Sequence, residues 1–192
     1  MARPREFDIN EAVERAMLLF WEKGYQATSL SDIQRVLDIG RASLYAAFGD
    51  KESLFLKALA LYLERYTSTL SVLDQDAPAM ELLQKLFNCL AALYTGASTP
   101  QGCLVLAASL ECGTTQDPVG RAVSASIAYG EEKFQKALMR AQKEGSLSCN
   151  ADVKAIARFL MASSQGMAAL AKRGGSRKEV EDVGRLVLSS LQ

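Results

Sequence analysis

The sequence predicts an all-α protein of about nine helices, in which an N-terminal three-helix helix-turn-helix module precedes a helical bundle. Apolar residues recur at intervals of three and four along the whole chain, without a convincing alternating β-branched run. Capping residues, glycines and prolines divide the 192 residues into segments of helical length. The early segments are mostly short and the later ones are mostly long, which indicates a small module and a larger bundle.

The N-terminal helices are bounded by residues that favour helix ends. Asp8 is suited to cap the first helix, and Gly24 ends it. Thr28 and Ser29 can cap the second helix, and Asp50 can cap the long fourth one. The helices predicted on this basis span 9–24, 29–37, 41–48 and 51–70.

The bundle helices follow from the same kind of signal. Pro78 lies near the first position of a helix, where its fixed φ is favourable. Gly113 is a stop, Asn150 is an N-cap candidate, and Ser176 stands at capping-box spacing from Glu179. The predicted bundle helices span 78–94, 103–112, 118–144, 150–173 and 176–191.

Charge and residue content exclude several classes of function. The chain has 22 cationic and 22 acidic side chains, which argues against a protein that coats polyanions. It has no histidine, so histidine-dependent catalytic triads and histidine metal sites are excluded, and we expect no cofactor and no metal. We also expect a soluble, cytoplasmic protein with no membrane partner, because no apolar run approaches a membrane span.

The four cysteines form no C-x-x-C pair, which is atypical of a zinc ribbon or a disulfide scaffold and favours a reducing compartment. They are Cys89, Cys103, Cys112 and Cys149.

The two shortest helices have the pattern of a helix-turn-helix. The turn 37–40 contains a hydrophobe, Ile39, that can be buried between the helices. The outer face of the second short helix carries groups that can reach bases or phosphates, and Lys51 adds a cation at the start of the next helix. The residues on this face are Arg41, Ser43 and Ala47, with Tyr45 and Ala46 alongside.

Two segments carry a resemblance to a known family. They are GYQATSLSDI at 24–33 and IGRASLYAAFGDKESL at 39–54. Together they resemble the N-terminal DNA-binding domain of the tetracycline-repressor (TetR/AcrR) family, over about residues 8–56. The resemblance implies a homodimeric, ligand-responsive repressor with three partners: palindromic double-stranded operator DNA, a small organic effector and a second copy of the chain. It also implies a DNA-binding domain at 1–50, a connecting helix at 51–72 and a ligand-binding and dimerisation domain at 73–192.

The resemblance assigns DNA contacts to residues of the motif. Thr28 and Ser29 are expected at phosphates, as are Tyr45 and Lys51. Base edges are expected to meet Arg41, Ser43 and Ala46, with Ala42 beside them where the family often has glycine. The basic arm with Arg3 and Arg5 is suited to a minor groove, although it is equally suited to being a solvated terminus.

The bundle provides candidates for an interface and for a ligand pocket. Small residues at helical spacing in 150–173, together with apolar residues of the last helix, favour a self-complementary dimer interface; intramolecular packing is the alternative. The interface candidates are Ala162, Gly166, Ala169, Val183, Leu186 and Val187. The pocket candidates, each of which can instead be plain core, are Phe87, Leu90, Tyr94, Leu106, Leu110, Tyr129 and Met161.

Other functions remain as alternatives. A sensor in which Cys103 or Cys112 is oxidised or alkylated is compatible with the same fold, although no cationic neighbour in the sequence favours a reactive thiolate. An all-α enzyme is disfavoured because no nucleophile stands beside a base, so we expect no enzymatic activity. A helical adaptor that never touches DNA is the remaining alternative.

Overall fold

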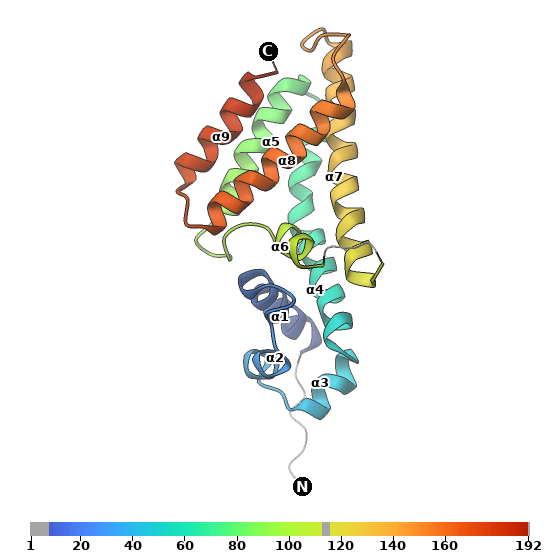
Figure 1. Cartoon of the computed structure of the whole chain (residues 1–192), viewed down its shortest axis with the longest axis vertical. Helices are drawn as coiled ribbons and strands as arrows, with labels where there is room; N and C mark the ends of the chain where they lie inside the picture. The colour runs from blue at the N-terminus through green and yellow to red at the C-terminus, as the bar shows by residue number, and fades with distance from the viewer. Residues whose placement is uncertain (1–7, 113–115, 192) are drawn as a thin grey trace.

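The computed structural model describes residues 8–112 and 116–191, and all regular structure in these ranges is helical (Figure 1). The elements are α1 (Ile9–Lys23), α2 (Leu30–Leu37), α3 (Arg41–Phe48), α4 (Lys51–Tyr66), the 3-10 helix η1 (Thr67–Asp74), α5 (Ala79–Tyr94), α6 (Leu104–Glu111), α7 (Pro118–Lys143), α8 (Val153–Lys172) and α9 (Arg177–Ser189). The predicted all-α class is confirmed.

The N-terminal helices begin at the capping residues that the sequence indicates. Oδ1 of Asp8 accepts hydrogen bonds from the backbone N–H groups of Asn10 and Glu11, at 2.7 and 3.3 Å. Ser29 and Asp32 form a reciprocal capping box at the start of α2. Gly24 follows α1 with φ of +92°, a conformation that glycine adopts without strain.

Two predicted helix boundaries are wrong. Helix α4 ends at Tyr66 instead of continuing to Leu70, and the chain proceeds as η1. In this segment the hydroxyls of Ser68 and Ser71 donate to the carbonyls three residues before them, which competes with the α-helical hydrogen bonds. At α8 the N-cap is Asp152, not Asn150, because the Asp152 carboxylate accepts from the first free N–H groups of the helix.

The molecule is elongated, with α1, α2 and α3 at one end and the bundle α5–α9 at the other (Figure 1). We call α1–α3, with the start of α4, the N-terminal module. Helix α4 runs from the module towards the bundle, and α6 lies between the two parts. Leu104 and Ala108 of α6, with Val119 and Val123 of α7, belong to the same hydrophobic cluster as the core of the module. The module therefore packs directly on these two bundle helices.

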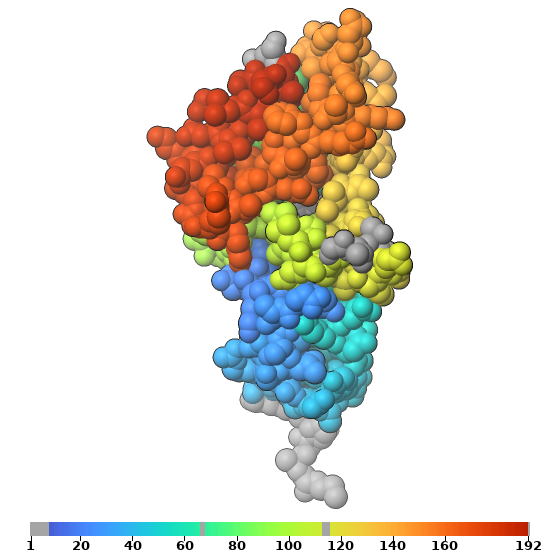
Figure 2. Space-filling model, in the orientation of Figure 1, coloured from blue at the N-terminus to red at the C-terminus, as the bar shows by residue number. Residues whose placement is uncertain are grey.

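The bundle has its own hydrophobic cluster, formed mainly by α5, α7, α8 and α9. One face of α8 and α9 is open at the surface (Figure 2). Gly184 of α9 marks a close helix crossing on the inner side, since an added Cβ would lie 3.1 Å from Cδ1 of Phe87 in α5. None of the helices in the described ranges has the length and hydropathy that a membrane span needs.

Candidate nucleic-acid interface and bundle cavity

Helix α3 presents a polar and small-residue face at the tip of the N-terminal module. Its inner side is fixed by Leu44 and Phe48, which are buried against Ile33 and Leu37 of α2. Asp38 makes the tight turn between the helices in the left-handed conformation, with φ of 56°. Five residues of the outer face are exposed: Arg41, Ala42, Ser43, Tyr45 and Ala46. An eight-residue helix with such a face fits the width of a DNA major groove.

The exposed face of α3 contains two kinds of chemical group. The Arg41 guanidinium lies 5.6 Å from the centre of the Tyr45 ring, so the two side chains lie along the same side of the helix. Guanidinium and hydroxyl groups donate hydrogen bonds, whereas Ala42 and Ala46 offer only methyl groups. Direct hydrogen bonding from this face is therefore concentrated on Arg41, Ser43 and Tyr45.

Thr28 and Ser29 lie at the start of α2 in different environments. Thr28 is fully buried, and its hydroxyl donates to the carbonyl of Gly24 at 2.5 Å. The expectation that Thr28 meets a phosphate is therefore corrected: its hydroxyl closes the loop between α1 and α2. Ser29 is exposed and caps α2, with its hydroxyl donating to Oδ2 of Asp32 at 2.6 Å.

Lys51 lies at the start of α4, but its ammonium faces the module. Nζ donates to the carbonyl of Gln26 at 3.3 Å and lies 4.6 Å from the centre of the Tyr25 ring. Burial lowers the pKa of Lys51, while the nearby Glu111 carboxylate opposes this change. To bind a phosphate outside the module, this ammonium has to turn away from the 25–26 loop.

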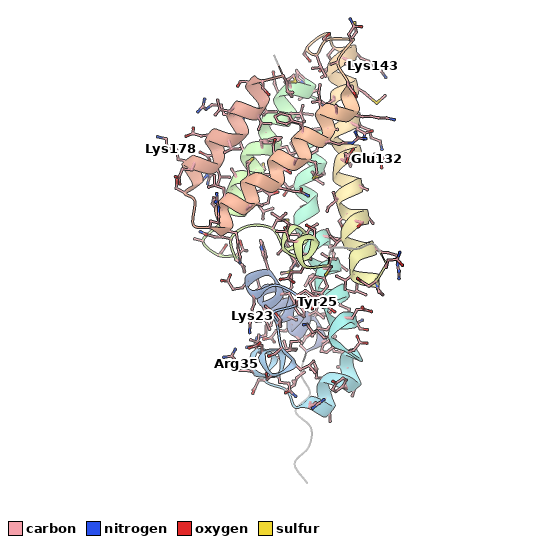
Figure 3. The ribbon with its side chains drawn as sticks, in the orientation of Figure 1. Lys23, Tyr25, Arg35, Glu132, Lys143 and Lys178 are labelled. Carbon is pink, nitrogen blue, oxygen red and sulfur yellow. The ribbon has the colours of Figure 1, made fainter. Side chains whose placement is uncertain are left out.

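A charged cluster on α1 and α2 was missed by the sequence interpretation. Nζ of Lys23 donates to Oδ2 of Asp32 at 2.5 Å, and Arg35 donates to Oδ1 at 3.0 Å (Figure 3). The hydrogen bond from Lys23, and then those from Ser29, hold the pKa of Asp32 far below its usual range. Arg35 is exposed, so it adds a cation to this side of the module. The i,i+3 spacing of Asp32 and Arg35 could have predicted this ion pair from the sequence. Arg3 and Arg5 lie outside the described residues.

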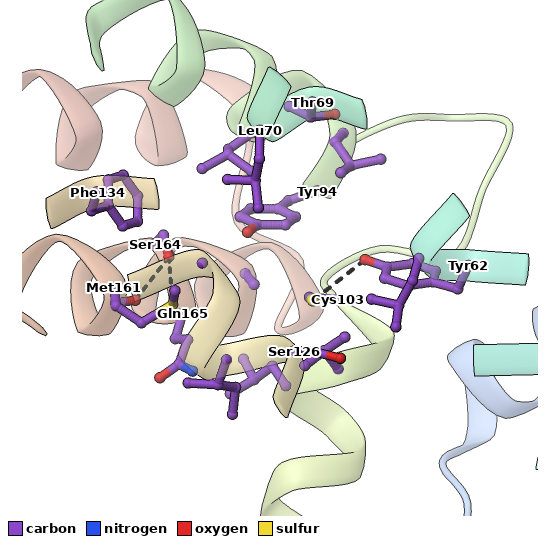
Figure 4. A pocket seen from close by; sticks show the side chains of 18 residues that line it. Tyr62, Thr69, Leu70, Tyr94, Cys103, Ser126, Phe134, Met161, Ser164 and Gln165 are labelled. Atoms are coloured by element: carbon purple, nitrogen blue, oxygen red, sulfur yellow. Dashed lines mark hydrogen bonds between the residues drawn. The ribbon is translucent and has the colours of Figure 1, made fainter. Parts of the chain in front are cut away.

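A cavity of about 100 Å³ lies inside the bundle (Figure 4). Of the predicted pocket residues, the structure brings together four at this cavity: Leu90, Tyr94, Leu106 and Met161. Other lining residues come from α4, η1, α7 and α8, so helices far apart in the sequence enclose the space.

Three predicted pocket residues lie elsewhere. Phe87 is buried in the bundle core, where it packs on α9 and lies 6.1 Å from the ring of Phe134. Leu110 is 77% exposed and borders a different crevice, next to the N-terminal module. Tyr129 is 47% exposed, and the ammonium of Lys133 lies 5.6 Å from the centre of its ring. Helical spacing identified apolar positions but not which helix face borders the cavity.

Except for Tyr94, the polar groups at the cavity were missed by the prediction. Tyr62 donates a hydrogen bond to Sγ of Cys103 at 3.4 Å, and the hydroxyl of Ser164 donates to the carbonyl of Met161 at 2.8 Å (Figure 4). Gln165 also borders the space. Burial raises the pKa of Tyr62 and of Tyr94 well above the usual value, so both phenols are neutral. The one available signal was a Ser-Gln pair within the otherwise small and apolar stretch 159–171 of α8.

The outer face of α8 and α9 contains most of the predicted interface residues. Ala162, Gly166 and Ala169 are exposed along α8, and Leu186 of α9 is 60% exposed. An added Cβ on Gly166 would meet nothing within 4 Å in this chain, so Gly166 makes no close crossing here. The other two predicted interface residues are less exposed: Val183 is half-buried at the edge of this face, and Val187 is buried in the bundle core. Val187 is therefore removed from the predicted interface.

The two cysteines considered as sensors lie in different places. Cys103 is half-buried and lines the cavity. Cys112 lies at the end of α6, where burial raises its pKa and the nearby carboxylates of Asp117 and Glu111 add to the effect. A thiol with a raised pKa is mainly protonated at neutral pH and is a poor nucleophile.

Two protein-family models match the chain. The model described as "Bacterial regulatory proteins, tetR family" matches residues 12–58, which include the N-terminal helices. The model described as "Tetracyclin repressor-like, C-terminal domain" matches residues 79–187, which is more than half of the chain. The two matches divide the chain in the same order as the module and the bundle.

Individual relatives match over nearly the whole chain. The HTH-type transcriptional repressor ComR of Escherichia coli K12 is 29% identical over 183 residues, covering 94% of this chain and 87% of ComR. BdcR, a repressor from the same organism, is 28% identical over 93% of this chain and 86% of its own length. A cysteine mutant of the TetR family regulator CifR, crystallised with 26-bp double-strand operator DNA, is 34% identical, with a TM-score of 0.87 over 99% of this chain and 100% of that chain.

Proposed function

Since this chain belongs to the tetR family of bacterial regulatory proteins, we propose that it is a homodimeric repressor that binds a palindromic operator through α3 and releases it when a small uncharged organic molecule occupies the bundle cavity. Membership of this family makes the chain a DNA-binding transcriptional regulator and not an enzyme. The homodimer, the repressor function, the operator and the effector are the proposed parts.

The exposed face of α3 is the observation that carries the proposal for DNA. It offers Arg41 for a guanine edge, Ser43 for an adaptable hydrogen bond and Tyr45 for a phosphate. The CifR complex supports this, because that relative aligns with nearly all of this chain and was crystallised on operator DNA. ComR and BdcR, both named as repressors, support repression as the outcome of binding.

The open face of α8 and α9 supports a homodimer. Two short α3 helices related by a two-fold axis can read half-sites about 34–36 Å apart, which is one turn of DNA. Joining two weak half-site contacts raises the affinity without extra positive charge, which suits a chain with formal net charge of zero. We therefore propose that Ala162, Gly166, Ala169 and Leu186 contact a second copy.

The cavity supports an uncharged effector. None of its 18 lining residues is Asp, Glu, Lys or Arg, and the chain has no histidine. Burying an ion without a partner is far more costly than burying a neutral molecule. The hydroxyls of Tyr62, Tyr94 and Ser164 provide a few polar groups that can orient a ligand with a hydrogen-bonding group.

Fluorescence anisotropy on a duplex selected in vitro by the wild-type protein tests the DNA assignment. Arg41→Ala should relax the preference for the selected duplex over a scrambled one by about tenfold, because one bidentate base contact provides about 1–3 kcal/mol. Lys51→Ala should weaken binding to both duplexes alike, because a phosphate contact carries no sequence information.

Lys178→Ala is the matched control, since this exposed cation lies on α9, far from α3 (Figure 3). It should leave both affinities unchanged. Equal effects of Arg41→Ala and Lys51→Ala on the two duplexes would contradict the assigned roles. If no duplex can be selected, the proposal that this chain binds an operator fails as a whole.

A second candidate is a regulator of the same fold in which Cys103 is oxidised or alkylated. The observation that favours it is that Cys103 borders the cavity, where an incoming reagent would meet its sulfur. Mass spectrometry after mild peroxide or iodoacetamide treatment distinguishes the two candidates. Modification of Cys103 with loss of DNA binding supports the thiol sensor, and four unmodified thiols remove it.

A further inference from the structure

Two side chains connect the helices around the cavity to one spot in the N-terminal module. Glu111, the last residue of α6, contacts the loop that joins α1 to α2. Lys172, the last residue of α8, contacts the end of α1. Both contacts cross from the bundle to the module, and their partners are separated by only a few residues of the chain.

Glu111 is built into the 24–26 loop. Its Oε2 accepts a hydrogen bond from the backbone N–H of Gln26 at 2.7 Å, across 85 residues of sequence. Gly24 makes room for the same carboxylate, because an added Cβ would collide with Oε1 of Glu111. Lys51 of α4 donates to the carbonyl of the same Gln26 residue. The Gln26 residue is therefore held by α6 through its N–H and by α4 through its carbonyl.

Lys172 caps the C-terminal end of α1. Its ammonium donates to the carbonyls of Glu22 and Trp21, at 2.9 and 3.3 Å, and lies 3.7 Å from Oε2 of Glu22. Carbonyls in the last turn of a helix lack helical partners and carry partial negative charge, so a cation there is favourable. Helix α8 therefore holds the end of α1 by charge-assisted hydrogen bonds.

Both helices also form the wall of the cavity. Leu106 lines it from α6, five residues before Glu111, which is about 8 Å along a helix. Ala168 lines it from α8, one turn before Lys172. On the opposite side of this wall a crevice of about 330 Å³ separates α6 and α8 from α1, and Cys103, Leu106 and Ala168 border both spaces. A single layer of side chains thus separates the cavity from the contacts with the module.

We propose that Glu111 and Lys172 are positioning residues that transmit occupancy of the cavity to the N-terminal module. A molecule that displaces α6 or α8 moves the Glu111 carboxylate or the Lys172 ammonium, and with them the end of α1 and the loop before α2. Helices α2 and α3 follow because they share one packed core with α1. This proposal rests on the proposed function, in which cavity occupancy controls DNA binding.

The contacts that Glu111 and Lys172 make with the module are called the links. Two substitutions on α7 can fill the cavity without changing either link. Ser126→Leu adds apolar atoms to the lining, and the Ser126 hydroxyl that it removes bonds only within α7, to Ala122. Gly130→Ala places a methyl group where Cε of Met161 now lies and forces that flexible side chain to move. Each filling substitution is made in two backgrounds: one with Glu111 and Lys172 intact, and one that also carries Glu111→Ala and Lys172→Met. Thermal melts verify that every variant folds.

Hydrogen exchange of the Gln26 amide and operator anisotropy are the two measurements. Glu111→Ala should speed exchange of this amide by about tenfold or more, because its acceptor is lost. Glu111→Gln retains an acceptor oxygen and should restore most of the protection. Glu132→Ala, which removes an exposed carboxylate on α7, is the matched control and should change neither measurement (Figure 3).

With the links intact, at least one filling substitution should alter Gln26 exchange and lower affinity for the selected duplex by about tenfold, a coupling of ordinary size. Without the links, the same substitution should change the affinity less than twofold. An equal loss with and without the links overturns the roles of Glu111 and Lys172 and leaves the proposed function standing. If neither filled variant changes the affinity although wild type binds the duplex, control of DNA binding by the cavity fails, and this proposal fails with it.

Discussion

The cores of the N-terminal module and of the bundle are built from different side chains. In the hydrophobic cluster that contains the core of the module, aromatic rings of α1 pack edge to face on rings of α4: Phe20 on Phe55 at 5.1 Å and Trp21 on Tyr62 at 5.0 Å between centroids. The bundle core consists mainly of leucine and alanine and borders a cavity. Close-packed interiors resist small displacements, whereas a hollow bundle can rearrange around a guest. The module is thus suited to move as a unit and the bundle to change shape.

The largest expected effect comes from truncating one phenylalanine in each core. Phe20→Ala should lower the free energy of unfolding by about 4 kcal/mol, because ring contacts on all sides are lost. Phe134→Ala should cost less, about 3 kcal/mol, since the Phe134 ring already borders empty space. Guanidinium unfolding measures both, with circular dichroism for all helices and the fluorescence of Trp21, the single tryptophan, for the module. An equal or larger cost at Phe134 would contradict the proposed contrast between the cores.

A matched pair of small molecules tests whether binding inside the bundle depends on the charge of the ligand. Benzyl alcohol and benzoate have similar size, but only benzoate is charged at neutral pH. A neutral guest at ten times its dissociation constant stabilises the folded protein by about 1.4 kcal/mol. We expect benzyl alcohol to raise the melting temperature and to perturb NMR signals of cavity methyl groups, and benzoate to do neither. Binding of benzoate inside the bundle would contradict the argument from the uncharged lining.

A smaller effect is expected at Gly166, on the outer face of the bundle. In a free helix, Gly166→Ala would favour the fold by about 1 kcal/mol. At a close helix crossing between two copies, the added methyl group separates the helices. We therefore expect the dimer dissociation constant from sedimentation equilibrium to rise about fivefold, equivalent to about 1 kcal/mol.

Gly184→Ala provides the comparison for this experiment. Its Cβ would press on Phe87 inside the bundle, so this substitution should lower the unfolding free energy and leave the dimer constant unchanged. A dimer constant that does not respond to Gly166→Ala would contradict the α8–α9 interface.

The module was more predictable from sequence than the bundle because its signals are local. Ser29 and Asp32 define the start of α2 by their spacing, and the buried positions of α3 follow from its helical period. In the bundle, the helical period identified apolar residues but did not show which of them contact one another. Leu90 and Phe87 lie three residues apart on α5, yet Leu90 lines the cavity and Phe87 packs against α9. That distinction depends on the neighbouring helices.

The sequence by itself determined the helical class, most helix limits and the exposed face of α3, because caps, glycines and apolar period act over a few residues. Only the tertiary structure decided that Thr28 is buried, and which side chains meet across long separations: Tyr62 and Cys103 at the cavity, and Glu111 on the amide of Gln26. The physical reason is that a hydrogen bond or a cavity wall between distant segments depends on how whole helices pack. No local spacing in the chain specifies that packing.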